Sequence, residues 1–302
     1  MKGSISPPTL KDLDLSPGKR VRLHRLLYEH GPGNGTLLIL PIDQGLEHGP
    51  RDFFPNPDSA DPEFQFRLAK EGGYSGIALH FGLAQKYLRG FEGDVPVILK
   101  LNGKTEVPPD EEAFSPMTGT VVDAVRLGAD AVGYTLYVGS AAQDRDIVQL
   151  RDVRRQADRY GMPLIVWAYP RGRDIEKKGG RNGLYAIDYA ARVAAELGAD
   201  VIKLNLPEAN AEKDKNSPAP YKTLQWSHEE MVRQVIRSAG KSLVIISGGE
   251  KMGDQELLEK ARVSLESGAT GFIFGRNLWQ RPFPEGIKIT QQLKALLKEY
   301  GA

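Results

Sequence analysis

Eight short runs of β-branched and aliphatic residues recur along the chain, and segments with helical spacing of apolar residues separate them. Strands that alternate with helices form parallel sheets, and eight strands are the number that closes a barrel. We therefore predict an α/β fold, a (β/α)8 TIM barrel. The runs cover residues 36–45, 76–82, 95–103, 131–139, 163–172, 201–206, 243–249 and 271–279.

The segments between the runs predict the outer helices. In residues 144–161 and 185–199, apolar residues recur at three- and four-residue spacing, and a glycine lies at or near the end of each segment. LGAD closes such segments at 127–130 and 197–200, and SGAT does so at 267–270. A doubly wound open sheet is the alternative, but the turn after the first run, PIDQGLEHGP, lacks the GxGxxG pattern usual there.

We predict a helical N-terminal extension over residues 1–35 and a single catalytic barrel domain over residues 36–302. The extension contains a basic stretch at 19–30, expected as a solvated helix or as a cap on the bottom of the barrel. A net charge of +1 and the lack of a long apolar run argue against nucleic-acid and membrane partners. The N-terminus also lacks the apolar stretch of a secretory signal, so we expect a cytoplasmic protein.

Two lysines interrupt apolar runs and are the candidate nucleophiles, because a chain without cysteine cannot use thiolate chemistry. Lys203 lies in VIKLNL and Lys100 in VPVILKLNG. Burial at either place favours the neutral amine, which attacks a carbonyl carbon and forms a Schiff base. The structural alternative is a lysine paired with a buried carboxylate. The apolar surroundings do not choose between the two lysines.

Strand periodicity places further polar residues beside Lys203. Alternate residues of a strand share a face, so Lys203 and Asn205 are expected to point into the barrel mouth. In the preceding run, Trp167, Tyr169 and Arg171 share a face by the same period. The Tyr169 hydroxyl is a candidate general acid or base. Trp167 fits a packing role at least as well as a catalytic one.

Candidate phosphate sites follow three of the runs. The fifth run opens a loop, RGRDIEKKGGRN, with five basic and two acidic residues. The seventh and eighth runs end in ISGGEK and FGRN, and glycines in these barrel loops let backbone N–H groups approach phosphate oxygens. The alternative for the glycines is a tight turn without a ligand. We assign phosphate binding to Arg171, Ser247, Gly248, Gly249, Gly275 and Arg276.

Asp43 ends the first run, and Glu47 and His48 follow it. Three such groups can bind a divalent metal, but the five histidines of the chain show neither H-x-H nor H-x-x-x-H spacing. We therefore expect no metal. Asp43 is expected to orient substrate hydroxyls or to move their protons, with capping of the next helix as its structural alternative.

Several motifs, in this order, resemble those of the archaeal-type class I fructose-bisphosphate aldolases, which also occur in bacteria: DQGLEHGP, KLNGKT, WAYPRG, the lysine of the sixth run, SGGEK and GRNLWQ. The resemblance covers roughly residues 36–280. It implies that Lys203, rather than Lys100, forms the Schiff base. It also implies that Asp43, Trp167 and Tyr169 are active-site residues, with Tyr169 in proton transfer, and that the six residues assigned above hold phosphates.

The same resemblance implies a reaction and an assembly. The reaction is metal-independent, reversible cleavage of fructose 1,6-bisphosphate to dihydroxyacetone phosphate and glyceraldehyde 3-phosphate, a step of glycolysis and gluconeogenesis. The assembly is a homo-oligomer, often built from pentameric rings into a decamer. One alternative is a related Schiff-base aldolase, transaldolase or thiolase-like enzyme acting on another phosphorylated keto compound. The other is a non-catalytic phosphosugar-binding barrel.

Overall fold

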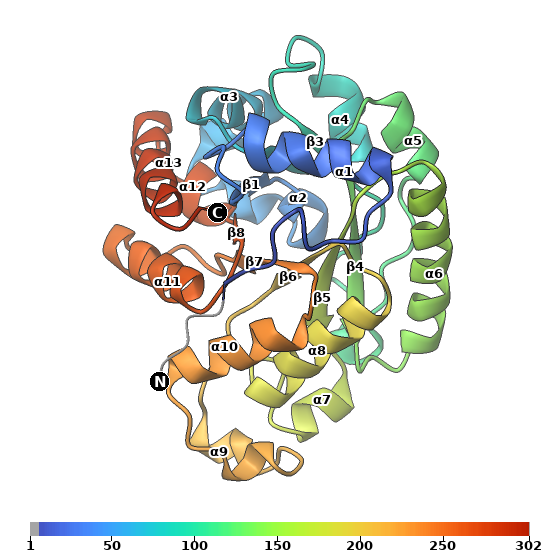
Figure 1. Cartoon of the computed structure of the whole chain (residues 1–302), viewed down its shortest axis with the longest axis vertical. Coiled ribbons are helices and arrows are strands. Elements are labelled where there is room, and N and C mark those ends of the chain that lie inside the picture. The colour runs from blue at the N-terminus through green and yellow to red at the C-terminus, as the bar shows by residue number, and fades with distance from the viewer. Residues whose placement is uncertain (1–5, 302) are drawn as a thin grey trace.

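The computed structural model describes residues 6–301, which form a closed barrel of eight parallel strands surrounded by helices (Figure 1). Each strand pairs with the next, and β8 pairs with β1. The predicted (β/α)8 barrel is confirmed, and the doubly wound sheet is not the fold. The strands are β1 Leu37–Pro41, β2 Gly76–His80, β3 Val97–Lys100, β4 Ala131–Val138, β5 Leu164–Pro170, β6 Val201–Leu204, β7 Leu243–Ser247 and β8 Gly271–Ile273.

The helices of the described residues lie in the segments before, between and after the strands. The helices predicted at 144–161 and 185–199 correspond to α6 and α8. The α-helices are α1 Pro17–His24, α2 Gln44–Glu47, α3 Pro62–Gly72, α4 Phe81–Tyr87, α5 Val121–Arg126, α6 Gln143–Arg159, α7 Arg173–Lys177, α8 Leu184–Glu196, α9 Ala211–Asp214, α10 His228–Ser238, α11 Asp254–Glu266, α12 Arg276–Trp279 and α13 Phe283–Lys298. The shorter helical turns are η1 Arg25–Glu29, η2 Pro50–Phe53, η3 Pro57–Ala60, η4 Asp110–Glu112 and η5 Tyr221–Thr223.

The eighth predicted run, residues 271–279, is longer than the strand that the structure contains there. β8 ends at Ile273, and the backbone N–H groups of Leu278 and Trp279 donate to the carbonyl of Gly275 as α12 begins. Leu278 and Trp279 are both fully buried. A short buried helix and a buried strand have the same apolar composition, which is why the pattern alone extended the strand through 279.

The strands send alternate side chains into two separate apolar clusters. On β6, Val201 lies in the cluster inside the barrel, whereas Ile202 and Leu204 lie in the cluster between strands and helices. The two-residue period predicted this division, and it turns Lys203 inward. The interior cluster also contains Leu37, Ile39, Ala78, Ile98, Ala131, Ile165, Trp167, Leu243, Ile245 and Ile273.

The segment before β1 closes one end of the barrel, and Figure 1 shows α1 lying across it. Lys19 Nζ lies 2.8 Å from Asp200, and Arg25 Nη1 lies 3.0 Å from Asp130. These aspartates end the two LGAD motifs, so the repeats anchor the extension at the starts of β6 and β4. Of the two expectations for this stretch, the bottom cap is correct. Three of its leucines are buried in the interior cluster: Leu23, Leu26 and Leu27.

The glycines of LGAD and SGAT end their helices in the left-handed region. The φ angles of Gly128, Gly198 and Gly268 are 68°, 93° and 99°, which side chains with a Cβ rarely adopt. After β6 the chain makes a longer excursion and packs back on α8, where the Tyr221 hydroxyl donates to Asp188 Oδ2 at 2.7 Å. Within residues 6–301, no helix has both the length and the apolarity needed to span a bilayer.

Candidate active site

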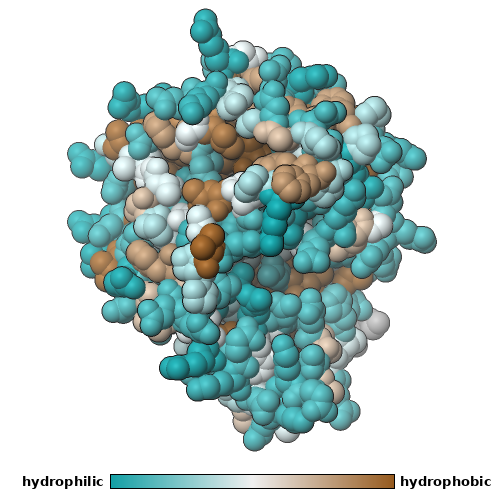
Figure 2. All heavy atoms as spheres, turned by 180° about the vertical axis from the view of Figure 1, so that it is seen from behind, coloured by the Kyte–Doolittle hydropathy of each residue, from teal (hydrophilic) through white to brown (hydrophobic). Residues whose placement is uncertain are grey.

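A pocket of about 430 Å³ lies at the carboxyl ends of the strands, opposite the N-terminal cap. Seen from behind in Figure 2, the molecule has a mostly hydrophilic surface that is hollowed near its middle. About half of the lining residues have a charged side chain, of either sign, so the pocket suits a polar ligand. They are Pro41, Asp43, Gln44, Glu47, His48, Arg51, Lys104, Glu106, Asp110, Tyr137, Tyr169, Arg171, Arg181, Lys203, Asn205, Ser247, Gly248, Gly249, Glu250, Ile273, Gly275 and Arg276.

The structure brings all but one of the predicted site residues to this pocket. The exception is Trp167, which is fully buried beneath it in the interior cluster. Its ring centroid lies 5.4 Å from Lys203 Nζ and 4.7 Å from Lys100 Nζ. Trp167 therefore contacts both lysines, and within residues 6–301 its Nε1 has no hydrogen-bond partner.

Lys203 has the surroundings of an amine that gives up its proton easily. It pairs with Trp167 and Ile245 on the neighbouring strands and is 6% exposed. Burial lowers the pKa of Lys203 from 10.5 to about 8, with the Lys100 and Arg276 charges acting in the same direction, although Asp43 and Glu47 oppose them. Near neutral pH a usable fraction of Lys203 is thus a neutral nucleophile.

Lys100 is even more deeply buried, yet its environment favours the opposite charge state. Its Nζ lies 2.7 Å from Glu47 Oε1 and 3.1 Å from Asp43 Oδ2. Burial opposes the charge, but these two carboxylates outweigh it and raise the pKa of Lys100 above its ordinary value. Lys100 therefore stays an ammonium ion, a cation rather than a nucleophile.

Asp43 is tied to this ion pair and does not cap a helix. It stands at the N-cap of α2, but its side chain makes no capping hydrogen bond, so the structural alternative considered for it is wrong. Although burial opposes ionisation, the Lys100 ammonium holds the pKa of Asp43 below its usual range. Asp43 is a carboxylate on the pocket wall, available to accept hydrogen bonds from ligand hydroxyls.

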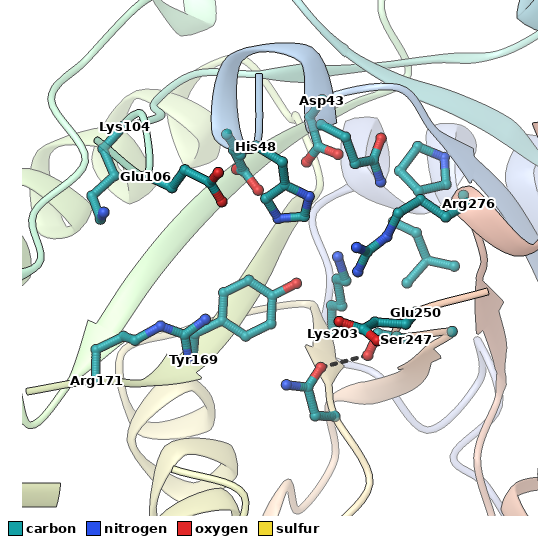
Figure 3. A pocket seen from close by; sticks show the side chains of 18 of the residues that line it. Asp43, His48, Lys104, Glu106, Tyr169, Arg171, Lys203, Ser247, Glu250 and Arg276 are labelled. Atoms are coloured by element: carbon teal, nitrogen blue, oxygen red, sulfur yellow. Dashed lines mark hydrogen bonds between the residues drawn. The ribbon is translucent and has the colours of Figure 1, made fainter. Parts of the chain in front are cut away.

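Tyr169 lies between Lys203 and Arg171 (Figure 3). Its ring centroid is 5.2 Å from Lys203 Nζ and 5.2 Å from Arg171 Cζ. Burial raises the pKa of Tyr169 far above its ordinary value, and Glu47 and Asp43 add to the effect. The hydroxyl therefore keeps its proton and can deliver it to a carbon or oxygen atom held beside Lys203.

The turn after β7 brings backbone close to the pocket. Ser247 Oγ donates to Asn205 Oδ1 at 2.5 Å, the contact drawn dashed in Figure 3. A Cβ on Gly248 would lie 2.7 Å from Asn277 Nδ2, and Gly249 has a left-handed φ of 73°. Both positions therefore require glycine, as a cradle of backbone N–H groups would.

The turn after β8 faces the first one. A Cβ on Gly275 would lie 2.7 Å from Gln44 Nε2 and 3.0 Å from Trp279 Nε1, so a side chain here would displace its neighbours. Arg276 follows it, and its Nε lies 3.9 Å from Asp52. Figure 3 shows Arg276 on the same side of Lys203 as Ser247 and Glu250. The two turns thus line the pocket beside the amine.

Glu47 and His48, which were considered as metal ligands together with Asp43, both have partners within the protein. Glu47 reaches Lys100, and His48 Nδ1 lies 2.8 Å from Asp52 Oδ2. Throughout the described part of the chain, no group of three or more histidine, aspartate or glutamate side chains is arranged to hold a metal ion.

Sequence reasoning missed several pocket residues: Lys104, Asp110, Tyr137, Arg181 and Glu250. Arg181 had a signal, because it belongs to the basic loop that follows β5. Asp110 and Glu250 had none. A loop carboxylate that faces a pocket has the same sequence context as one that faces solvent.

The fold and this site define a (β/α)8-barrel enzyme with a buried, readily deprotonated lysine at the barrel mouth. A family model described as "DeoC/LacD family aldolase" matches residues 37–281, and the chain belongs to this family. It is 40% identical to the class 1 fructose-bisphosphate aldolase of Thermoproteus tenax, over 87% of this chain and 90% of that protein.

Two further relatives are informative. A solved archaeal fructose-1,6-bisphosphate aldolase, whose catalytic lysine is covalently bound to the carbinolamine intermediate of the substrate, is 36% identical with a TM-score of 0.77, over 91% of this chain and 99% of that one. The 2-amino-3,7-dideoxy-D-threo-hept-6-ulosonate synthase of Halobacterium salinarum is 33% identical over 88% of this chain and 87% of that protein.

Proposed function

We propose that this protein is a class I aldolase that reversibly cleaves fructose 1,6-bisphosphate into dihydroxyacetone phosphate and glyceraldehyde 3-phosphate. The observation that carries the proposal is the lowered pKa of Lys203, about 8, beside Tyr169 at the barrel mouth. Relatives that are 36–40% identical over most of the chain and act as fructose-bisphosphate aldolases support the choice of substrate.

Lys203 begins the reaction. Its neutral Nζ attacks the C2 ketone, the resulting carbinolamine loses water, and an iminium ion forms. The iminium nitrogen accepts the electron pair of the C3–C4 bond as that bond breaks. The C4 hydroxyl loses its proton and becomes the aldehyde of glyceraldehyde 3-phosphate. Because the iminium is the electron sink, the reaction requires no metal ion.

Tyr169 completes the cycle. The enamine left on Lys203 takes a proton at C3, which we assign to the Tyr169 hydroxyl because burial keeps that group protonated. Water then hydrolyses the new iminium, which releases dihydroxyacetone phosphate and frees the Lys203 amine. Asp43 orients the hydroxyls of the sugar, and Trp167 supports the amine from below.

The glycine turns hold the phosphate nearer the ketone. We assign this role to Ser247, Gly248, Gly249, Gly275 and Arg276, and contact with the other phosphate to Arg171. Two anchored phosphates fix the ketone relative to Lys203, which is the positioning that an aldolase needs.

Borohydride reduction in the presence of dihydroxyacetone phosphate tests the proposal directly. Reduction converts the iminium to a stable amine, and peptide mass mapping locates it. We expect the label on Lys203, none in a Lys203→Met variant, and full activity after EDTA treatment. A label on Lys100 would reverse the assignment of the nucleophile, and no label at all would favour a non-catalytic phosphosugar-binding barrel.

A substrate panel tests the specificity. The synthase relative named above favours a second candidate, a Schiff-base enzyme acting on another phosphorylated keto compound. We expect kcat/KM to be highest with fructose 1,6-bisphosphate. Clearly faster turnover of another phosphorylated ketose would establish the second candidate instead.

We further propose a cytoplasmic homo-oligomer, with pentameric rings as the expected unit. Three exposed valines of α1 and α5 support self-association: Val21, Val122 and Val125 are 63%, 41% and 39% exposed. Light scattering coupled to gel filtration measures the assembly mass, and a monomeric mass would contradict this part of the proposal.

A further inference from the structure

Three cations of the pocket converge on one carboxylate that belongs to the protein itself. Asp110 begins η4, in the long loop between β3 and α5. Lys104 Nζ lies 3.0 Å from Asp110 Oδ1, whereas Arg171 Nε and Arg181 Nη1 lie 3.2 Å and 3.0 Å from Oδ2. All four side chains line the pocket.

The cations outnumber the acids that face them. Arg181 also approaches Glu176, at 3.8 Å, but no second carboxylate is paired with Lys104 or Arg171 within residues 6–301. Lys104 and Arg171 are the more buried members, with side chains 12% and 20% exposed against 39% for Asp110. Asp110 is thus more exposed than Lys104 and Arg171, whereas Arg181, at 47%, lies at the outer edge of the cationic cradle that the three basic side chains form.

The cradle lies on the far side of Tyr169 from Lys203. Arg171 and Lys203 approach the Tyr169 ring at the same distance, 5.2 Å, and Figure 3 shows Tyr169 between them. Ser247, Glu250 and Arg276 lie beyond Lys203 in the same view. A ligand with an anionic group at each end would therefore extend from the turns, past the amine, to this cradle.

We propose that Asp110 is a built-in counter-ion that the distal phosphate of the substrate displaces from Lys104, Arg171 and Arg181. This inference rests on the proposed function, because it names how the same site selects a bisphosphate. A phosphate ester near neutral pH carries nearly two negative charges and the carboxylate carries one, so Coulombic attraction to the cradle favours the phosphate.

The exchange makes Asp110 a specificity-determining residue. A ketose with two phosphates can replace Asp110 and gains all three cations. A ketose phosphorylated only beside its ketone leaves Asp110 in place and gains none of them. The carboxylate also keeps the three cations together in the empty enzyme, which reduces their mutual repulsion.

Asp110→Asn tests the exchange, because it removes the competing charge and keeps the shape. We expect the KM for fructose 1,6-bisphosphate to fall about three- to tenfold, while the KM for fructose 1-phosphate does not change. Glu111→Gln is the matched control, since Glu111 is exposed on the same turn and has no ion pair among the described residues. A raised KM for the bisphosphate, or equal effects on both ketoses, would overturn the proposal.

Calorimetric titration with inorganic phosphate separates this inference from the aldolase reaction. We expect Asp110→Asn to bind phosphate about three- to tenfold more tightly than the unchanged protein, and Asp110→Ala to shift the affinity in the same direction. The gain must disappear when Arg171→Gln is added, because that variant removes a member of the cradle. Tighter phosphate binding in a protein without aldolase activity would leave the exchange standing and refute the function alone, whereas unchanged or weaker binding would refute the exchange.

Discussion

The strands β3 and β6 each carry one lysine into the barrel, and folding shifts the pKa values of the two lysines in opposite directions. Both flank Trp167, and both are at least nine-tenths buried. Lys100 has two carboxylates within 3.1 Å, whereas Lys203 makes no ion pair within residues 6–301, and burial outweighs the more distant influence of the same two carboxylates on its pKa. A buried lysine is therefore reactive when burial is not compensated by a nearby negative charge.

This difference assigns separate tasks to the two sites. The strand β6 site carries an energetic cost, because the Lys203 ammonium group loses its hydration on burial without gaining an ion pair among the described residues. On β3, the Lys100 ammonium group is paired with Asp43 and Glu47, and its charge helps to lower the pKa of Lys203. In the proposed function, Lys203 carries out the chemistry and Lys100 gives electrostatic support.

Lys203→Met should have the largest effect, in opposite directions on activity and stability. We expect activity to fall about 10⁴-fold or more, because within residues 6–301 the other lysines at the site, Lys100 and Lys104, are held in ion pairs. The folded protein binds the Lys203 proton less tightly than the unfolded chain does, so in the native sequence the free energy of unfolding rises between pH 8 and pH 10.5.

Below pH 8 that cost is present in full, so the methionine variant should be more stable by about 3 kcal/mol at pH 7. Chemical denaturation with and without the substitution measures this difference. A less stable variant would mean that Lys203 is paired as well as Lys100 is, and the contrast between the strands would fail.

Tyr169→Phe should lower kcat by about 10² to 10⁴-fold, since the enamine loses its proton donor. Borohydride trapping on Lys203 should persist, because the amine itself is intact. Tyr137→Phe is the control: Tyr137 pairs with Tyr169 across β4 and β5 and also lines the pocket. If both substitutions lowered kcat equally, the hydroxyl of Tyr169 would have no special role.

Lys100→Met should shift the pH dependence rather than abolish the reaction. In the native sequence kcat/KM should rise with pH through the pKa of Lys203, about 8. Without the Lys100 cation, Asp43 and Glu47 raise the pKa of Lys203. The rising limb of the kcat/KM profile should therefore move to higher pH by about one unit. The unpaired carboxylates should also lower the free energy of unfolding by about 3–5 kcal/mol. A limb that stayed in place would show that Lys100 does not act on Lys203.

Trp167→Phe should have the smallest effect. The indole ring attracts both ammonium groups, and a phenyl ring does so more weakly, by about 1 kcal/mol. The rising limb of the kcat/KM profile near pH 8 should therefore move to slightly lower pH, and activity should change about fivefold or less. A loss comparable to that of Tyr169→Phe would indicate that Trp167 touches the substrate, although it lies beneath the pocket.

Much of the site could be predicted because strand periodicity is local information. The alternation in VIKLNL placed Lys203 inside the barrel, and the same alternation placed Trp167, Tyr169 and Arg171 beside it. The glycines after β7 and β8 were found by their type and their place behind strands. The predicted end of β8 was wrong, because Leu278 and Trp279 are as buried in α12 as they would be in a strand.

The choice between the two lysines could not be made from their surroundings in the sequence. Glu47 lies 53 residues from Lys100 and Asp43 lies 57 residues from it, and no local pattern links them. The same holds for Asp110, which meets Arg171 and Arg181 only across the barrel mouth. In the sequence, each of these carboxylates looks like an ordinary solvent-exposed residue. Only the folded positions of the loops reveal its partners.

The order of apolar runs and helical segments was enough to define the barrel, the end of it that carries the site and the face of each strand. These properties follow from short-range periodicity, which every segment carries by itself. The charge state of each buried lysine was set only by folding, because Coulombic energy depends on distances between groups that are far apart in the chain. That is why Lys100 and Lys203, so alike in sequence, differ in the folded protein.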